Sequence, residues 1–107
     1  MTPEQFARGV AAERDAIMEI YFKEPPTTAV GAQIKALSLS AQQTASLRQI
    51  LHGALTDMCH SLLLGLDGAA SIGDLRQQEF QLADEKGNEL TGGELEVAAS
   101  EVFHGDE

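Results

Sequence analysis

The sequence predicts a single α+β domain that is mostly helical, with three main helices and a short helix around one small antiparallel β-hairpin. Two observations indicate this class. Apolar residues recur every three or four positions over most of the chain, but alternate with other residues every second position after residue 74. The length of 107 residues is that of one domain, and an apolar fraction of 43% suffices for a hydrophobic core.

The first helix is expected over residues 3–22. Thr2 and Gln5 form a capping box, in which the side chain of each residue accepts a hydrogen bond from the backbone N–H of the other. Pro3 suits the first helical position. Prolines at 25–26 end the helix, because proline disfavours the helical conformation of the preceding residue and has no N–H to donate.

A short helix is expected over residues 29–37 and a long one over residues 41–64. Ser40 and Gln43 form a second capping box in front of the long helix. Gly65 is expected to end this helix as a left-handed residue just past its last turn. The long helix has a continuous apolar stripe, formed by Leu47, Leu51, Ala54, Leu55, Met58 and Leu62.

The β-hairpin is expected over residues 77–90. Phe80 and Leu82 alternate with other residues at the period of a strand, and a glycine-containing turn follows at residues 84–88. Two strands are marginally stable by themselves, so one face of the hairpin is expected to lie against the helices.

The last helix is expected over residues 92–103. Thr91 and Glu94 form the third capping pair. His104 and Gly105 then supply a potential cation and a glycine, both typical of helix C-termini.

Negative charge is concentrated in the last third of the chain. The net charge is −10, and residues 74–107 alone carry ten acidic and two basic side chains, for a net charge of −8. Such a surface repels nucleic acids and anionic membranes and attracts a basic protein. The alternative is that the acids only keep the protein soluble. The residues expected to contact a partner are Glu85, Glu89, Glu94, Glu96 and Glu101.

The segment LLLGLDGAASIGD, residues 62–74, is a candidate ligand loop. Glycine-rich turns can enclose an anion with backbone N–H groups, but this loop lacks the Gly-Lys-Ser/Thr ending of a phosphate-binding loop. It also lacks the alternating oxygen ligands of a calcium loop. It therefore either holds a ligand or only connects two elements. The candidate ligand residues are Asp67, Gly68, Ser71 and Asp74.

Chemically reactive side chains gather on one face of the long helix. His52 and His60 are eight residues apart, which is about 12 Å along a helix axis and too far to share one metal ion. Cys59 and His60 are adjacent and point about 100° apart, which is unsuited to activating a thiolate. These residues belong to a metal site, to a nucleophilic centre or simply to the core and surface. No complete catalytic, metal or cofactor constellation is evident, so the sequence predicts no enzyme and no cofactor.

The compartment is expected to be the cytoplasm. Cys59 is the only cysteine, so no internal disulfide forms, which fits a reducing environment. The longest apolar run is far shorter than the roughly 20 residues of a membrane span, and acids and bases alternate at the N-terminus, unlike in a secretory signal.

Three segments, LLLGLDGAASIGD, DEKGNEL and GELEVAASEVFHG, resemble parts of small acidic bacterial proteins with no assigned activity. The resemblance covers about residues 40–105 and contains no residue with a known catalytic role. In size and charge the chain is also similar to immunity proteins that neutralise toxins. This resemblance implies a basic partner, such as a toxin.

The sequence thus predicts a non-enzymatic protein-interaction module, of the immunity-protein or inhibitor kind, whose acidic C-terminal surface binds a basic partner. The alternative is a small-ligand or metal-binding module that uses residues 65–74 and the helix face of His52 and His60. The sequence leaves the oligomeric state open.

Overall fold

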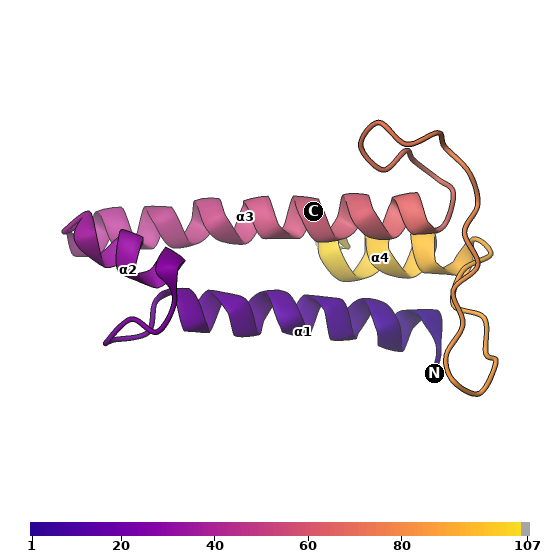
Figure 1. Ribbon diagram of the computed structural model, residues 1–107, viewed down its shortest axis with the longest axis horizontal. Coiled ribbons are helices and arrows are strands. Elements are labelled where there is room, and N and C mark those ends of the chain that lie inside the picture. The colour runs from indigo at the N-terminus through magenta and orange to yellow at the C-terminus, as the bar shows by residue number, and fades with distance from the viewer. Residues whose placement is uncertain (106–107) are drawn as a thin grey trace.

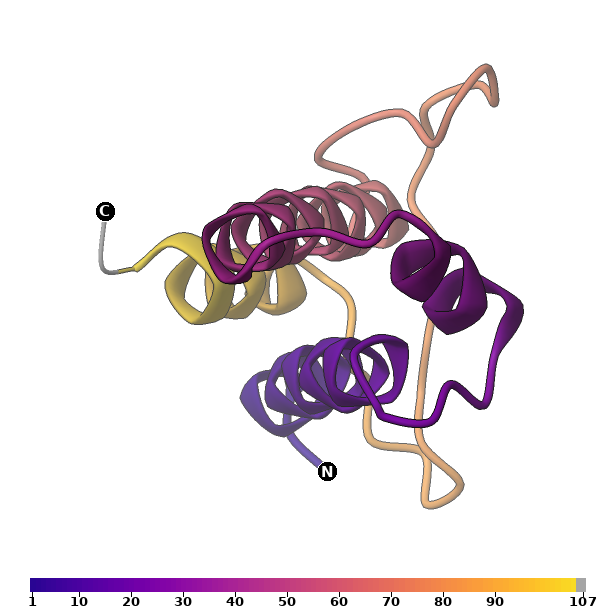
Figure 2. The same cartoon turned by 90° about the vertical axis from the view of Figure 1, so that its left-hand side faces the viewer.

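The computed structural model describes residues 1–105, and within them the chain forms four helices and no strands. The helices are α1 (Pro3–Tyr21), α2 (Ala29–Ala36), α3 (Ala41–Leu66) and α4 (Glu94–His104). α1 and α3 run antiparallel along a molecule of 46 × 28 × 27 Å, and α4 lies beside the C-terminal part of α3 (Figures 1 and 2). α2 lies at the opposite end of the molecule (Figure 1). Among the described residues, no helix combines the length and apolarity needed to cross a membrane.

The capping boxes of the first and third helices are confirmed. The Thr2 hydroxyl accepts the Gln5 N–H at 3.1 Å, and the Gln5 side chain accepts the Thr2 N–H at 2.9 Å. Ser40 and Gln43 repeat both bonds at the start of α3. Each box satisfies two N–H groups that have no partner within the helix.

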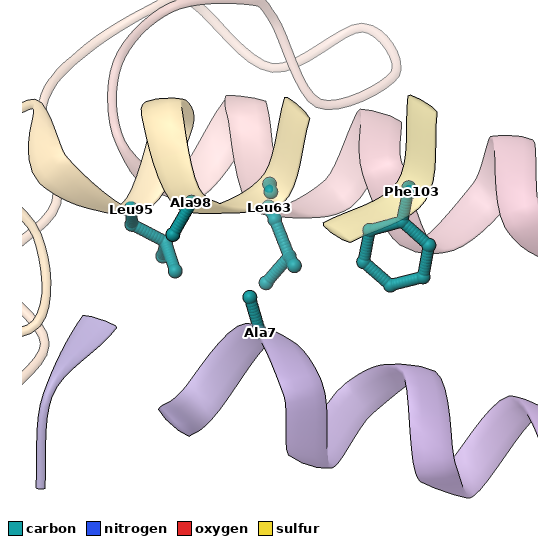
Figure 3. Packing of buried hydrophobic residues seen from close by; sticks show 6 residues of the cluster. Ala7, Leu63, Leu95, Ala98 and Phe103 are labelled. Carbon is teal, nitrogen blue, oxygen red and sulfur yellow. The ribbon is translucent and has the colours of Figure 1, made fainter. Parts of the chain in front are cut away.

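The hydrophobic core lies where α1, α3 and α4 meet. Ala7 of α1 points toward Leu63 of α3 and toward α4, so a small residue lets the helices approach closely (Figure 3). A polar contact borders this core, because Arg14 Nη1–H donates to the buried hydroxyl of Thr56 at 3.0 Å. The core consists of Ala7, Leu63, Leu95, Ala98, Ala99 and Phe103.

The expectation that Gly65 ends the long helix is wrong. α3 continues to Leu66, and Gly65 is buried within it, where a Cβ would overlap Cγ1 of Ile72. The left-handed residue is Gly68, with φ 78°. The Gly68 N–H donates to the Gly65 carbonyl and the Ala69 N–H donates to the Leu64 carbonyl, which is the Schellman pattern of a helix end. Gly65 is therefore required for close packing.

The predicted β-hairpin and the α+β class are also wrong, since the described chain is all-helical. The chain reverses at residues 84–88, but the only ladder contact is a single bridge between Ala83 and Glu89. In a regular hairpin the Leu82 N–H would donate to the carbonyl of Leu90. Here it donates to the hydroxyl oxygen of Thr91 at 3.1 Å. A side-chain acceptor therefore takes the place of the next ladder bond, and no strand forms.

The apolar stripe of α3 is only partly covered. Thr56 and Leu63 are buried toward α1 and α4, whereas Ile50 and Met58 on another face are 65% and 63% exposed. Of the predicted stripe, Ala54, Met58 and Leu62 are exposed and Leu47, Leu51 and Leu55 are half-buried, so the most buried residues of α3 lie beside the stripe.

Candidate functional site

The carboxylate of Asp67 lies at the N-terminus of α4. Its Oδ1 accepts the N–H groups of Gly92 and Gly93 at 2.7 and 2.9 Å, and its Oδ2 accepts the N–H of Glu96 at 2.8 Å. A carboxylate at this position satisfies unpaired N–H groups and interacts favourably with the helix dipole. The Asp67 carboxylate of the glycine loop is thus occupied by the protein's own backbone.

This contact replaces the third predicted capping pair. Thr91 lies outside the helix, and α4 begins after Gly93, which has φ 104° and no side chain to cap with. The residue that caps α4 is Asp67, 26 positions before Gly93. A cap supplied from so far along the chain leaves no local spacing pattern, so it could not be predicted from the sequence.

The four candidate residues of the glycine loop do not come together. Asp67 and Gly68 line a cavity, while Ser71 and Asp74 are exposed elsewhere in the loop and do not line it. The Gly68 carbonyl accepts a hydrogen bond from the Gln77 side chain at 2.9 Å. The loop residues 67–74 therefore connect α3 to the rest of the chain and do not form one ligand cradle.

The cavity beside Asp67 is the candidate functional site. It has a volume of about 600 Å³ and is bordered by the glutamates Glu79, Glu89 and Glu96, with Phe80 as an apolar wall. None of these glutamates forms an ion pair with a described lysine or arginine. We call these three residues, with the cavity between them, the acidic cavity. A site of this charge favours a cationic side chain or ligand.

The structure divides the five acidic residues predicted to contact a partner. Glu89 and Glu96 border the acidic cavity. Glu94 and Glu101 line a second groove, against the first turn of α1. Glu85 is exposed in the turn at residues 84–88. The acids are all exposed, but they face more than one direction.

Glu79 borders the acidic cavity but is not among the five acidic residues predicted from the sequence to contact a partner. It stands in the segment predicted to be a strand, next to Phe80, and its side chain also contacts Gly68, since a Cβ on that glycine would lie 3.0 Å from Glu79 Cγ. Its position depends on the path of an irregular loop. The only available signal was its place in the acidic third of the chain.

Asp84 holds the turn of residues 84–88 and the N-terminus of the chain. Its carboxylate accepts hydrogen bonds from the Asn88 side chain at 2.9 Å, from the N-terminal ammonium of Met1 at 2.9 Å and from the N–H groups of Asn88 and Lys86. The Asn88 side chain, followed by the Met1 ammonium, lowers the pKa of this carboxyl well below its usual value. Asp84 is thus a structural anion and is not part of the acidic cavity.

The histidines of α3 lie in different surroundings. His52 lines a shallow groove between α1 and α3 with Asp15 and Glu19. His60 lies against α4, where its Nε2 is 3.3 Å from Ser100 Oγ and its ring is 4.7 Å from the ring of His104. In residues 1–105, no three histidine, cysteine, aspartate or glutamate side chains are grouped so as to hold a metal ion.

Cys59 is half-buried and packs against the core cluster. The side chains named for the alternative ligand or metal module therefore do not converge on one place. The chain matches no protein-family model, no curated protein and no solved structure.

Proposed function

We propose that the protein is a non-enzymatic interaction module that binds a basic protein partner through the acidic cavity. The observation that carries the proposal is the grouping of Glu79, Glu89 and Glu96 around one cavity, without a described lysine or arginine paired to any of them. An arginine or lysine side chain of the partner enters this cavity and forms charge-assisted hydrogen bonds with the carboxylates.

The position of the cavity supports a docking role. It lies where the loop after α3 meets the start of α4, and Asp67 ties these two segments together through three hydrogen bonds. Glu96 is therefore presented on a braced helix start, which reduces the conformational entropy lost on binding. The surrounding negative charge of residues 67–96 also accelerates encounter with a basic surface.

The proposal places the protein in the cytoplasm, where a single half-buried cysteine stays reduced. Inhibitors and toxin-neutralising immunity proteins work by such stoichiometric binding, and a basic toxin domain is the kind of partner that this surface fits. No catalytic group or cofactor takes part.

The experiment is affinity capture from cells of the source organism at low and at high salt. The bait is the wild-type chain, compared with the variant Glu79→Gln/Glu89→Gln/Glu96→Gln. We expect a basic protein that the wild type retains at low salt, that high salt releases, and that the variant fails to capture, since exposed charge pairs are screened over about 10 Å at 0.1 M salt.

The matched control is Glu13→Gln/Glu19→Gln, which removes negative charge from exposed positions of α1 outside the acidic cavity. This control should capture the partner as the wild type does. Capture that is equal for all three proteins, capture that is insensitive to salt, or the absence of any specific partner contradicts the proposal.

A further inference from the structure

One face of α3 is apolar and uncovered. Ile50, Ala54, Met58 and Leu62 follow each other at intervals of four residues, and each interval turns the helix by only about 40°. Ile50, Met58 and Leu62 are 65%, 63% and 40% exposed, and Ala54 is exposed as well. We call these four residues the outer stripe. It runs along about 18 Å of the helix at a rise of about 1.5 Å per residue.

The outer stripe differs from an ordinary solvent-facing helix surface. α3 has only two charged residues in 26, Arg48 and Asp57, whereas α1 has six in 19. The guanidinium of Arg48 lies over the ring of Phe22, 4.2 Å from its centroid, so this charge belongs to the contact between α3 and the end of α1. A solvated helix face normally carries several charged side chains, and their absence here indicates a surface that is covered by another molecule.

The chain itself covers only the margins of this face. At the C-terminal end, Ile72 of the loop packs on Gly65. Toward the N-terminal end, Leu37 and Leu39 join Leu47 and Ile50 in lining a groove of about 500 Å³. Between these margins the residues of the outer stripe remain exposed in the part of the chain that the structure describes.

The surface area leaves room for a partner of the same size. The chain exposes 7232 Å². A compact monomer of 11.4 kDa exposes about 5,800 Å², so the excess is about 1,400 Å². A stable dimer of standard size buries about 800 Å² per chain. The radius of gyration of 16.3 Å, against about 13 Å for a compact chain of this length, gives the same picture of an open, elongated protomer.

The distribution of charge selects the orientation of a second copy. Residues 22–48, at the end where α3 begins, carry three basic side chains and one acidic, for a net charge of +2. Residues 67–96, at the opposite end, carry eight acidic and two basic, for a net charge of −6 (Figure 1). Antiparallel copies place the basic end of one beside the acidic end of the other, whereas parallel copies bring two acidic ends together.

We infer that the outer stripe binds the outer stripe of a second copy of this chain, with the two α3 helices antiparallel across a two-fold axis. Such an interface is self-complementary, as a two-fold pair requires. The outer stripe shares no residue with the acidic cavity, so the pair offers two docking sites for a basic partner. The inference does not depend on the proposed function.

The first test is the mass of the full chain in solution, measured by light scattering and sedimentation over a wide range of concentrations. The wild type is expected at twice the mass of one chain. Ile50→Glu/Met58→Glu is expected at the mass of one chain, because four carboxylates cannot be buried together. Met58→Gln provides a milder variant, expected to dissociate at a higher concentration than the wild type.

The control is Val97→Glu, which adds a carboxylate at an exposed apolar position of α4 outside the outer stripe. It should remain a dimer, and circular dichroism should report wild-type helix content for all the variants. A wild type that stays at the mass of one chain overturns the inference. So does a dimer that survives both substitutions of the outer stripe.

The second test is orientation, from spin labels at Ala45→Cys or Ser61→Cys in a Cys59→Ala background. These positions are exposed and flank the outer stripe. With the two-fold axis at the middle of the outer stripe, near residue 56, antiparallel copies separate two labels at position 45 by about 33 Å along the axis, 22 residues at about 1.5 Å each, and two labels at position 61 by about 15 Å. A mixture of the two labelled chains brings unlike labels close together. Short distances between labels at the same position overturn the antiparallel arrangement.

The two proposals fail separately. Loss of the dimer in Ile50→Glu/Met58→Glu concerns the outer stripe only, and the acidic cavity variant is expected to keep the dimer mass. Capture of a basic partner is likewise expected to survive substitution of Val97.

Discussion

The carboxylate of Asp67, just past the end of α3, accepts the backbone N–H of Glu96 in α4 at 2.8 Å. The same side chain also accepts the N–H groups of Gly92 and Gly93. A helix N-terminus has several N–H groups without partners, and a carboxylate aligned with the helix dipole stabilises them. One side chain therefore fixes α4 relative to α3 across a 26-residue excursion of the chain.

Asp67→Ala is expected to lower the free energy of unfolding by about 2 kcal/mol, the upper range for loss of a helix cap. The measurement is urea denaturation followed by circular dichroism. Asp74→Ala is the matched control, since Asp74 is an exposed aspartate of the same loop. It should change the free energy of unfolding by less than about 0.5 kcal/mol. Equal effects of the two substitutions would refute the capping role of Asp67.

Gly65 and Gly53 are expected to respond to alanine with opposite signs. A Cβ at Gly53 meets nothing within 4 Å, whereas one at Gly65 overlaps Ile72. Gly53→Ala should raise the free energy of unfolding by up to about 1 kcal/mol, the difference in helix propensity. Gly65→Ala should lower it by about 1–3 kcal/mol, because Ile72 is displaced.

Thermal and urea unfolding of both variants measure this difference. The double variant Gly65→Ala/Ile72→Ala removes the side chain that the new methyl group meets. In the Ile72→Ala background, Gly65→Ala should therefore no longer destabilise the protein. A destabilisation by Gly65→Ala that is unchanged in that background would show that the contact with Ile72 is not its cause.

The helices of this fold were predictable because their signals are local. The boxes of Thr2 with Gln5 and Ser40 with Gln43 are spaced by three residues, and the structure forms both. The hairpin was mispredicted because alternation at Phe80 and Leu82 indicates a strand only if a partner supplies backbone acceptors. Here the Thr91 hydroxyl takes the Leu82 N–H instead, and this competition is not visible in a period-two pattern.

The candidate site depends on contacts between distant residues, which explains why the sequence defined it only in part. The acidity of the last third indicated an acidic surface, and Glu89 and Glu96 do border the acidic cavity. Glu79 joins them through the path of an irregular loop, and Asp67 leaves the set of ligand candidates because it caps a helix 26 residues away. Neither relationship has a fixed spacing along the chain.

Arg14 and Thr56 are expected to be energetically coupled. The Arg14 guanidinium donates to the Thr56 hydroxyl at 3.0 Å and lies 5.4 Å from the ring centroid of Phe103, so it links all three helices of the core. A hydrogen bond to a charged group contributes about 1.5–3 kcal/mol. A double-mutant cycle with Arg14→Met and Thr56→Val should give a coupling of about 1 kcal/mol or more in the free energy of unfolding. Strictly additive effects would show that the contact adds nothing to stability.

Asp84 is expected to make the stability of the fold depend on acid pH. Hydrogen bonds from the Asn88 side chain and then the Met1 ammonium, together with the N–H groups of Asn88 and Lys86, lower the pKa of this carboxyl well below its ordinary value. An unfolded chain has an aspartate pKa of about 3.9. Because the folded pKa is the lower of the two, Asp84 stabilises the fold above about pH 4, and this contribution is lost as the pH falls toward the folded pKa. Urea denaturation of the wild type and of Asp84→Asn should therefore give the largest difference in free energy of unfolding near neutral pH and a steadily smaller one below about pH 4.

Asp74→Asn, at an exposed loop position, serves as the control and should differ little from the wild type throughout. A difference between the wild type and Asp84→Asn that stays constant down to about pH 2 would show that these hydrogen bonds do not favour the ionised form.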